Sequence, residues 1–128
     1  MPKILLIEDE PQHILLVKIR LEIHGFQVEA AQNAAAGLKA AQLYKPDLIL
    51  LDLILPDMGP AELIKALREI PSARKTPIIA FTALDAFEIH RRHLNTEIAE
   101  FIPKPYEASE LLEKINKFVN KEEPSRTA

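Results

Sequence analysis

The chain lacks cysteine, and it lacks any hydrophobic run long enough to cross a bilayer. Without cysteine, it can form no disulfide, use no thiolate nucleophile and bind no cysteine-coordinated zinc. The longest apolar stretch, residues 48–55, is interrupted by Asp52 and is far shorter than the roughly 20 residues of a membrane-spanning helix. These absences favour a soluble protein.

An excess of basic charge is also absent, since the net charge is −3. Binding to nucleic acid or to a membrane surface usually requires a basic face. The first apolar run begins almost at the first residue, which leaves no room for a signal peptide. We therefore expect a cytoplasmic protein with neither nucleic acid nor membrane as a direct partner.

The size and composition suit one ordinary domain. The chain has 128 residues, of which 48% are hydrophobic and 27% are charged, enough to bury a substantial core. It contains no internal repeat and no low-complexity segment. We expect one domain over residues 1–120, followed by a polar and frayed tail over residues 121–128.

Short apolar runs alternate with amphipathic patterns along the whole chain. This alternation is typical of βα units, in which helices cover both faces of a parallel sheet. The predicted class is a doubly wound, three-layer α/β fold with five strands. The strands are expected at residues 3–8, 27–31, 47–52, 77–81 and 99–102, and the helices at 11–24, 34–44, 60–70, 85–95 and 107–120.

Polar side chains follow four of the predicted strands. Glu8 and Asp9 follow the first strand and Asp52 ends the third. Thr82 and Lys104 follow the fourth and fifth. Because these strand ends share one edge of a parallel sheet, the side chains should meet in one crevice. Clustered carboxylates are costly unless a cation neutralises them, and Mg²⁺ is usually held by one or two carboxylates plus phosphate.

Each of these residues also has a plainer interpretation. Glu8 and Asp9 could favour the N-terminus of the helix that begins near Pro11, and Glu10 is expected to be a solvated cap. Asp52 could face water at a strand end. However, a carboxylate directly after four aliphatic residues is expensive without a partner, and a nucleophilic aspartate that accepts a phosphoryl group would explain it. Thr82 and Lys104 are candidates for phosphate contact only because they are placed at the same sheet edge as the acids.

Four segments resemble the receiver domain of two-component response regulators, the CheY-like family. They are residues 4–11, 46–52, 77–83 and 101–105. The order and spacing of these segments match the family pattern, and the resemblance covers about residues 3–119. It implies a flavodoxin-like sheet with strand order 2-1-3-4-5.

The resemblance also implies a role for each candidate residue. Asp52 would be the phosphoacceptor, and Thr82 and Lys104 would contact the phosphoryl group. Mg²⁺ would be the cofactor. Its ligands would be Glu8, Asp9, Asp52 and the backbone carbonyl of Ile54. The phosphoryl donor would be a phosphohistidine of a sensor histidine kinase or phosphotransfer protein.

A conformational switch from Thr82 to Phe101 is a further implication, although Phe101 could equally be an ordinary core residue. The switch would alter a surface of the fourth helix, fifth strand and fifth helix, which would bind an unknown protein target. The protein would be a monomer or a phosphorylation-dependent dimer. Because Ile54 and Leu84 are bulky and apolar, we expect slow self-dephosphorylation.

The first predicted helix carries two apolar stripes. One, expected to face the sheet, contains Ile14, Val17 and Leu21. The other contains Leu15, Ile19 and Ile23. We favour packing of this second stripe beneath the last helix over contact with a kinase.

The histidines have plain interpretations. The segment His90-Arg91-Arg92-His93 is expected to be a solvated basic face, and no zinc site is expected there. His13 and His24 are interpreted as surface or helix-end residues.

Two prolines predict features of the secondary structure. Pro60 should begin a helix, and Pro103 suits an edge strand.

Two other functions compete with a receiver. A magnesium-dependent phosphohydrolase with an aspartate nucleophile usually has a second acid two residues later, where this chain has Ile54. A phosphorylation-independent interaction module would not need the intact acidic set. The sequence leaves open whether the receiver stands alone or belongs to a longer regulator.

Overall fold

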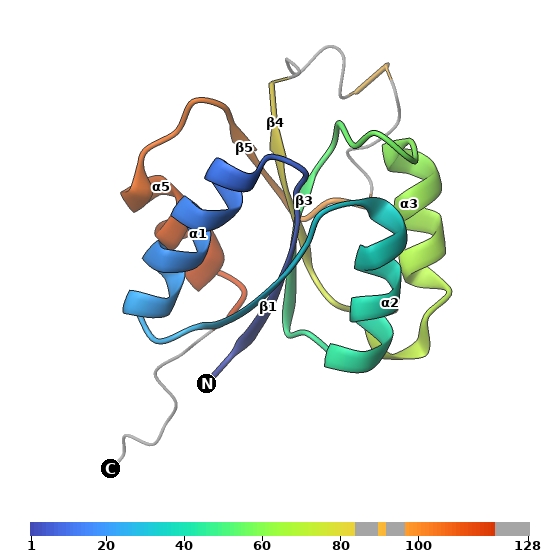
Figure 1. The fold of residues 1–128 in the computed structure, drawn as a ribbon, viewed down its shortest axis with the longest axis horizontal. Coiled ribbons are helices and arrows are strands. Elements are labelled where there is room, and N and C mark those ends of the chain that lie inside the picture. Colours follow the sequence, from blue (N-terminus) through green and yellow to red (C-terminus); the bar gives the residue numbers. More distant parts are fainter. Residues whose placement is uncertain (84–89, 92–96, 120–128) are drawn as a thin grey trace.

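The computed structural model describes residues 1–83, 90–91 and 97–119. Its centre is a parallel sheet of five strands in the order β2-β1-β3-β4-β5, with helices on both faces (Figure 1). The predicted fold class and strand order are confirmed. The strands are β1 Lys3–Ile7, β2 Gln27–Ala31, β3 Leu48–Asp52, β4 Ile78–Thr82 and β5 Glu100–Pro103.

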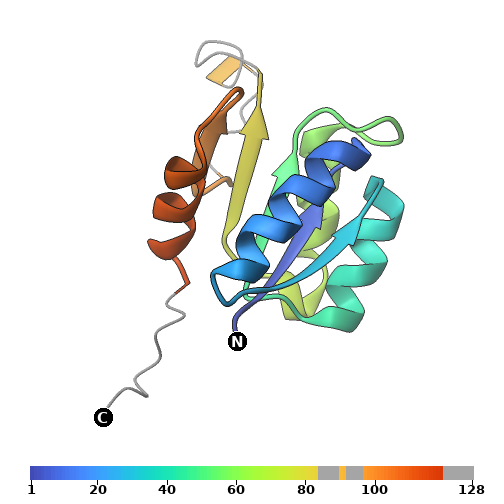
Figure 2. The same cartoon turned by 60° about the vertical axis from the view of Figure 1, so that its left-hand side comes forward.

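Helices α1 and α5 cover one face of the sheet, and α2 and α3 cover the other (Figures 1 and 2). The predicted helix over residues 85–95 lies mostly outside the described residues, as does the predicted tail. The described helices are α1 Pro11–Ile23, α2 Ala34–Tyr44, α3 Pro60–Arg68, the 3₁₀ turn η1 Pro71–Ala73 and α5 Ala108–Asn116.

The central strands are buried on both faces. Every residue of β3 and of β4 is buried, as expected for a sheet between two helical layers. Successive side chains alternate between two cores. Leu48 and Leu50 belong to the core beneath α1 and α5, and Ile49 and Leu51 to the core beneath α2 and α3.

Local sequence explains most of the element boundaries. Gly25 adopts a left-handed φ of 91° directly after α1, a conformation that glycine adopts without cost. Pro60 opens α3, as predicted. The predicted helix 60–70 instead ends at Arg68, because a residue before proline is driven out of the helical region. Ile70, which precedes Pro71, is accordingly extended, with ψ 118°.

The last helix is also shorter than the predicted 107–120, since α5 ends at Asn116. Leu111 and Ile115 are buried on its sheet-facing side. Phe118 lies beyond the helix end and is 40% exposed. The edge position of β5 agrees with the expectation from Pro103.

The prediction for the second stripe of α1 is wrong. Val17 and Leu21 are buried as predicted. The other stripe, which we name the α1 apolar face, consists of Leu15, Ile19 and Ile23, exposed by 59%, 48% and 74%. A step of two residues turns about 200° around a helix, so this stripe points away from the sheet and α5 does not cover it.

Candidate functional site

The polar residues predicted at the sheet edge occupy the carboxyl ends of four strands. Glu8 directly follows β1, Asp52 ends β3, Thr82 ends β4 and Lys104 directly follows β5. The carboxylates of Glu8, Asp9 and Asp52, which we call the acidic site, offer oxygen atoms that all lie within 4.8 Å of one another. Parallel register therefore brings together residues that are up to 44 positions apart (52 − 8) in the sequence.

Glu8 is the most buried member of the acidic site, with none of its surface exposed. Its Oε1 atom lies 2.6 Å from Nδ1 of His13 and 3.6 Å from Nζ of Lys104. Its Oε2 atom accepts a hydrogen bond of 3.2 Å from the backbone N–H of Glu10. Both oxygens are thus held, and a buried carboxylate needs such partners.

Asp52 is also buried, with 8% of its surface exposed, and does not face open water. The backbone N–H of Ile54 donates a hydrogen bond of 3.0 Å to Oδ1. Nζ of Lys104 lies 3.7 Å from Oδ2. Lys104 is therefore placed between two carboxylates, and its charge offsets part of their mutual repulsion.

The environment moves the pKa values of the two buried acids in opposite directions. Burial raises the pKa of Asp52 to about 6, and the nearby Glu8 charge adds to the effect. Burial also raises the pKa of Glu8, but other interactions outweigh this effect and lower the pKa to about 2. They are hydrogen bonds from His13, the Glu10 backbone and Asp52, and the charge of Lys104. The pair therefore has one firmly ionised member and one that ionises close to neutrality.

The remaining predicted residues surround this pair. Thr82 is almost fully buried at the end of β4, and its carbonyl accepts a 2.9 Å hydrogen bond from the Lys104 backbone N–H. Phe101 is partly buried against the core beneath α2 and α3. The side chain of Ile54 is 58% exposed. Leu84 lies outside the described residues.

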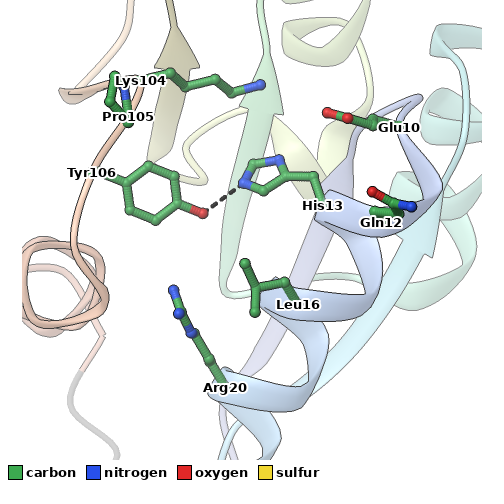
Figure 3. Close-up of a pocket in the computed structure, with 8 residues that line it drawn as sticks. All are labelled: Glu10, Gln12, His13, Leu16, Arg20, Lys104, Pro105 and Tyr106. Carbon is green, nitrogen blue, oxygen red and sulfur yellow. Dashed lines mark hydrogen bonds between the residues drawn. The ribbon is translucent and has the colours of Figure 1, made fainter.

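His13 lies in the first turn of α1, as the helix-end interpretation expected, but the sequence did not show that it also belongs to this region. Its side chain is only 11% exposed, and its Nε2 atom lies 2.5 Å from the hydroxyl of Tyr106 (Figure 3). The surface interpretation failed because the contact with Tyr106 spans 93 positions. The one usable signal was that each residue stands close to a predicted motif, His13 after the acid pair and Tyr106 after Lys104. His24, at the end of α1, is exposed as expected.

A cavity of about 530 Å³ lies between α1 and the segment that follows β5. His13 and Tyr106 meet across it, and Lys104 reaches into it from the β5 side (Figure 3). The cavity borders the acidic site without being part of it. Its lining consists of Glu10, Gln12, His13, Leu16, Arg20, Lys104, Pro105 and Tyr106.

The acidic site has the donor set that a hard divalent cation requires. Within the described residues, Glu8, Asp9 and Asp52 are the group of three metal-ligating side chains whose ligand atoms converge. All three donors are carboxylate oxygens, and Asp9 is exposed, so that waters and a phosphate could complete the coordination. This is the chemistry that Mg²⁺ prefers over a closed protein cage. No helix in the described ranges has the length and apolar character needed to span a membrane.

The sequence was compared with protein families and characterised proteins. The model of the response regulator receiver domain matches residues 4–116. The phosphate regulon transcriptional regulatory protein PhoB of Rhizobium meliloti is 31% identical over 124 residues, covering 97% of this chain and 55% of that protein. The DNA-binding dual master transcriptional regulator RpaA of Synechocystis is 31% identical over 115 residues, covering 90% of this chain and 48% of that protein.

Solved structures give the same result. The chemotaxis protein CheY4 of Vibrio cholerae superposes with a TM-score of 0.86 at 26% identity, covering 93% of this chain and 99% of that one. The receiver domain of a sensor histidine kinase from Pseudomonas aeruginosa PAO1 has a magnesium ion coordinated in its active site cleft. It superposes with a TM-score of 0.84 at 25% identity, covering 91% of this chain and 96% of that one.

The extent of these matches decides what they establish. The family match covers nearly the whole described chain, whereas the chain spans about half the length of the curated relatives. The shared part carries the sheet, the flanking helices and the acidic site. This chain belongs to the response regulator receiver domain family of two-component signalling proteins.

Proposed function

We propose that Asp52 accepts a phosphoryl group from a phosphohistidine of a sensor histidine kinase or phosphotransfer protein. Mg²⁺ would be held by Glu8, Asp9, Asp52 and the backbone carbonyl of Ile54. The single observation that carries the proposal is the convergence of three carboxylate ligands within 4.8 Å at the carboxyl edge of the sheet. Lys104 lies beside the same carboxylates, 3.6 Å from Glu8 and 3.7 Å from Asp52.

The transfer step follows from the chemistry of the two partners. An ionised Asp52 oxygen attacks phosphorus, the P–N bond of the donor breaks, and its electron pair stays on the imidazole nitrogen, which takes up a proton. A nucleophile must be ionised to attack. With a pKa near 6, Asp52 is mostly ionised at neutral pH.

Charge neutralisation is the main requirement of this step, because both reactants are anionic. Mg²⁺, when bound, supplies the positive charge that lets the Asp52 carboxylate and the phosphoryl oxygens share one pocket. Lys104, close to Asp52, would pair with another phosphoryl oxygen, and Thr82 would donate a hydrogen bond from its hydroxyl. These residues position and neutralise, and Asp52 alone forms a covalent bond.

Partners are expected to be proteins. The α1 apolar face is exposed beside the acidic site and offers a contact for the phosphohistidine-bearing partner. A phosphorylation-dependent change from Thr82 to Phe101 would alter the surface near β5 for a downstream target. The net charge of −3 does not favour nucleic acid as a direct partner.

The test is incubation with acetyl phosphate and Mg²⁺, followed by intact-mass analysis of the protein. The expected product carries one phosphoryl group on Asp52. It should be absent when Asp52→Asn is used or when EDTA removes the metal. Asp57→Asn is the matched control, because this nearby exposed aspartate lies outside the acidic site and the variant should still be labelled.

The same assay separates the competing functions. Rapid release of inorganic phosphate without a stable adduct would indicate a phosphohydrolase. Absence of any reaction, with both acetyl phosphate and a phosphohistidine donor, would leave a phosphorylation-independent interaction module. Either outcome would contradict the proposed phosphoacceptor role.

A further inference from the structure

A partly buried chain of hydrogen bonds leads from the acidic site toward the surface. The His13 ring lies between Glu8 and Tyr106, with Nδ1 2.6 Å from the Glu8 carboxylate and Nε2 2.5 Å from the Tyr106 hydroxyl. The three residues come from the end of β1, the first turn of α1 and the segment after β5. His13 thus contacts the Glu8 carboxylate directly, and Tyr106 supports it through His13.

The chemistry of the partners fixes the direction of the first of these hydrogen bonds. An ionised carboxylate can only accept, so the hydrogen of the first bond is carried by Nδ1 of His13. In the neutral ring, Nε2 then accepts from the Tyr106 hydroxyl. Burial raises the pKa of Tyr106 to about 12, so its hydroxyl keeps the hydrogen that it donates. With a neutral ring, the donors therefore run from Tyr106 through His13 to Glu8.

Aromatic packing holds the His13 ring in this orientation. The ring stands edge-on to Phe81, with centroids 4.9 Å apart and planes at 72°. It also stands edge-on to Tyr106, at 5.7 Å and 61°. Phe81 and Tyr106 stack on each other at 5.2 Å. Edge-to-face and offset-stacked contacts at these distances are favourable, so the ring has little freedom to turn.

His13 helps to fix the orientation of the Glu8 carboxylate. The Glu10 backbone N–H fixes Oε2, and His13 fixes Oε1, so the carboxylate plane is set from both sides. One oxygen each of Asp9 and Asp52 lies within 4.8 Å of a Glu8 oxygen. Partners that orient a metal ligand in this way commonly change metal affinity or activity 10- to 100-fold when removed.

We propose that His13, held by Tyr106 and Phe81, is a positioning residue that fixes the Glu8 carboxylate for binding of a divalent cation at the acidic site. It acts through Glu8, with which it shares a hydrogen bond. This inference rests on the proposed function, since the cation serves phosphoryl transfer to Asp52.

The first test measures the dissociation constant of Mg²⁺ by titration calorimetry, without phosphodonor. His13→Leu keeps an apolar side chain of similar size but removes both hydrogen bonds, and should weaken Mg²⁺ binding by roughly 10- to 100-fold. His13→Gln retains an N–H donor for Glu8 and should recover part of the loss. Tyr106→Phe keeps the stacked ring and removes only the distant hydroxyl, so a smaller, several-fold loss is expected.

The matched control is His24→Leu, which removes the exposed histidine at the other end of α1 and should leave Mg²⁺ affinity unchanged. Circular dichroism shows whether each variant is folded. A folded His13→Leu protein with the affinity of the original chain would overturn the proposal. If that protein still accepts a phosphoryl group from acetyl phosphate, the proposed function stands. An original chain that neither binds Mg²⁺ nor accepts phosphoryl would instead remove both.

A second test needs no variant and is independent of folding losses. Imidazole ¹⁵N–¹H correlation spectra of the original chain should show a hydrogen on Nδ1 of His13, as the bond to the Glu8 carboxylate requires. Addition of Mg²⁺ should shift these signals and leave those of His24 in place. An Nε2–H tautomer at His13, or signals that do not respond to Mg²⁺, would contradict the positioning role.

Discussion

At the scale of single residues, Lys104 attracts the carboxylates of the acidic site and also competes with a metal cation for them. Its ammonium lies within 4 Å of carboxylates from two strands, 3.6 Å from Glu8 and 3.7 Å from Asp52. Opposite charges at this separation interact by about 4 kcal/mol at an effective dielectric constant of 20. The same ammonium repels any second cation that approaches these oxygens.

Replacement of Lys104 by Met should therefore separate metal binding from phosphoryl transfer. Without the ammonium, Mg²⁺ binding should become several-fold tighter, because the carboxylates keep more of their negative charge. Labelling of Asp52 by acetyl phosphate should become slower, since one neutralising group is lost. Lys117→Met, which removes the same charge from the surface pair with Glu100, is the control. Weaker Mg²⁺ binding in Lys104→Met would contradict this account.

Ile54 gives a second prediction at this scale. Its exposed, apolar side chain stands two residues after Asp52 and cannot orient a water for attack on the phosphorus. Ile54→Asn introduces an amide that can hold a water by hydrogen bonds, so the aspartyl-phosphate should decay several-fold faster. Decay of the labelled protein by intact mass measures this. Ile54→Val, which stays apolar, should decay at the original rate, and equal lifetimes for all three chains would dismiss the idea.

At the scale of elements, helix α2 packs closely against β1 at Gly37. A Cβ atom at Gly37 would lie 2.6 Å from Cδ1 and 2.9 Å from Cγ1 of Ile7, which is fully buried in β1. The missing side chain thus sets the distance between α2 and β1. The N-terminus of α2 is fixed by the Asn33 side chain, which caps Ala36, and by Asp57 from the segment after β3.

Gly37→Ala should destabilise the fold despite the better helix propensity of alanine. Overpacking of a filled core costs about 1–3 kcal/mol, against a gain of up to about 1 kcal/mol from propensity. We therefore expect a net loss of roughly 1 kcal/mol in urea unfolding. The comparison is Gly59→Ala, where a Cβ meets nothing within 4 Å and the cost is limited to a weaker N-cap of α3. Equal stability of the two variants would show that Ile7 moves aside at little cost.

Asp57 provides a pH-dependent prediction. Hydrogen bonds from the backbone N–H groups of Ala34 and Ala35 hold the pKa of its carboxyl below the usual 3.8. A lowered folded-state pKa means that the stabilisation is complete above about pH 4 and disappears as the pH falls through the folded-state value. Asp57→Ala should lower the melting temperature by a few degrees at pH 7. The difference between the two proteins should shrink below pH 4.

The variant Asp57→Asn removes the negative charge of this side chain but keeps a hydrogen-bond acceptor, so it separates the two contributions to stability. It keeps one oxygen for the α2 N-terminus and should retain part of the stability at pH 7. Relative to Asp57→Ala, its advantage should not depend on pH. Thermal unfolding at several pH values checks both statements, and a constant difference between the original chain and Asp57→Ala down to the lowest pH would contradict them.

At the scale of the whole molecule, two features lie on the side of α1. The acidic site opens at the carboxyl edge of the sheet, and the α1 apolar face runs down from it. The three exposed side chains of this face have no covering element among the described residues. Exposed apolar groups that line up next to a reactive site are typical of partner contacts.

Ile19→Glu should therefore impair transfer from a phosphohistidine-bearing protein while sparing the fold. Introducing a charge into a contact that would exclude water should slow phosphotransfer at least 10-fold. Labelling by acetyl phosphate needs no protein contact and should not change. Leu43→Glu is the matched control, because Leu43 is equally apolar and exposed by 74%, on α2. Unimpaired protein-to-protein transfer by Ile19→Glu would exclude this surface.

Periodicity and local rules made much of this molecule predictable. The aliphatic runs ending at Asp52 and Thr82 predicted strands, and because parallel strand ends share an edge, the acidic site followed. Pro60 and Gly25 marked boundaries through their own backbone limits. The same reasoning overlooked how Pro71 stops α3 at Arg68, although the restriction on the residue before proline is also local.

What only the tertiary structure decided was how distant residues meet. Hydrophobic pattern and turn chemistry are properties of neighbours, so the sequence by itself determined the class of fold, the five strands and the edge that carries Asp52. The exposure of Ile19 depended on where α5 packs, and the burial of His13 depended on Tyr106, 93 positions away. A side chain's protonation and freedom are set by the groups that surround it in space, and those groups come together only when the sheet has formed.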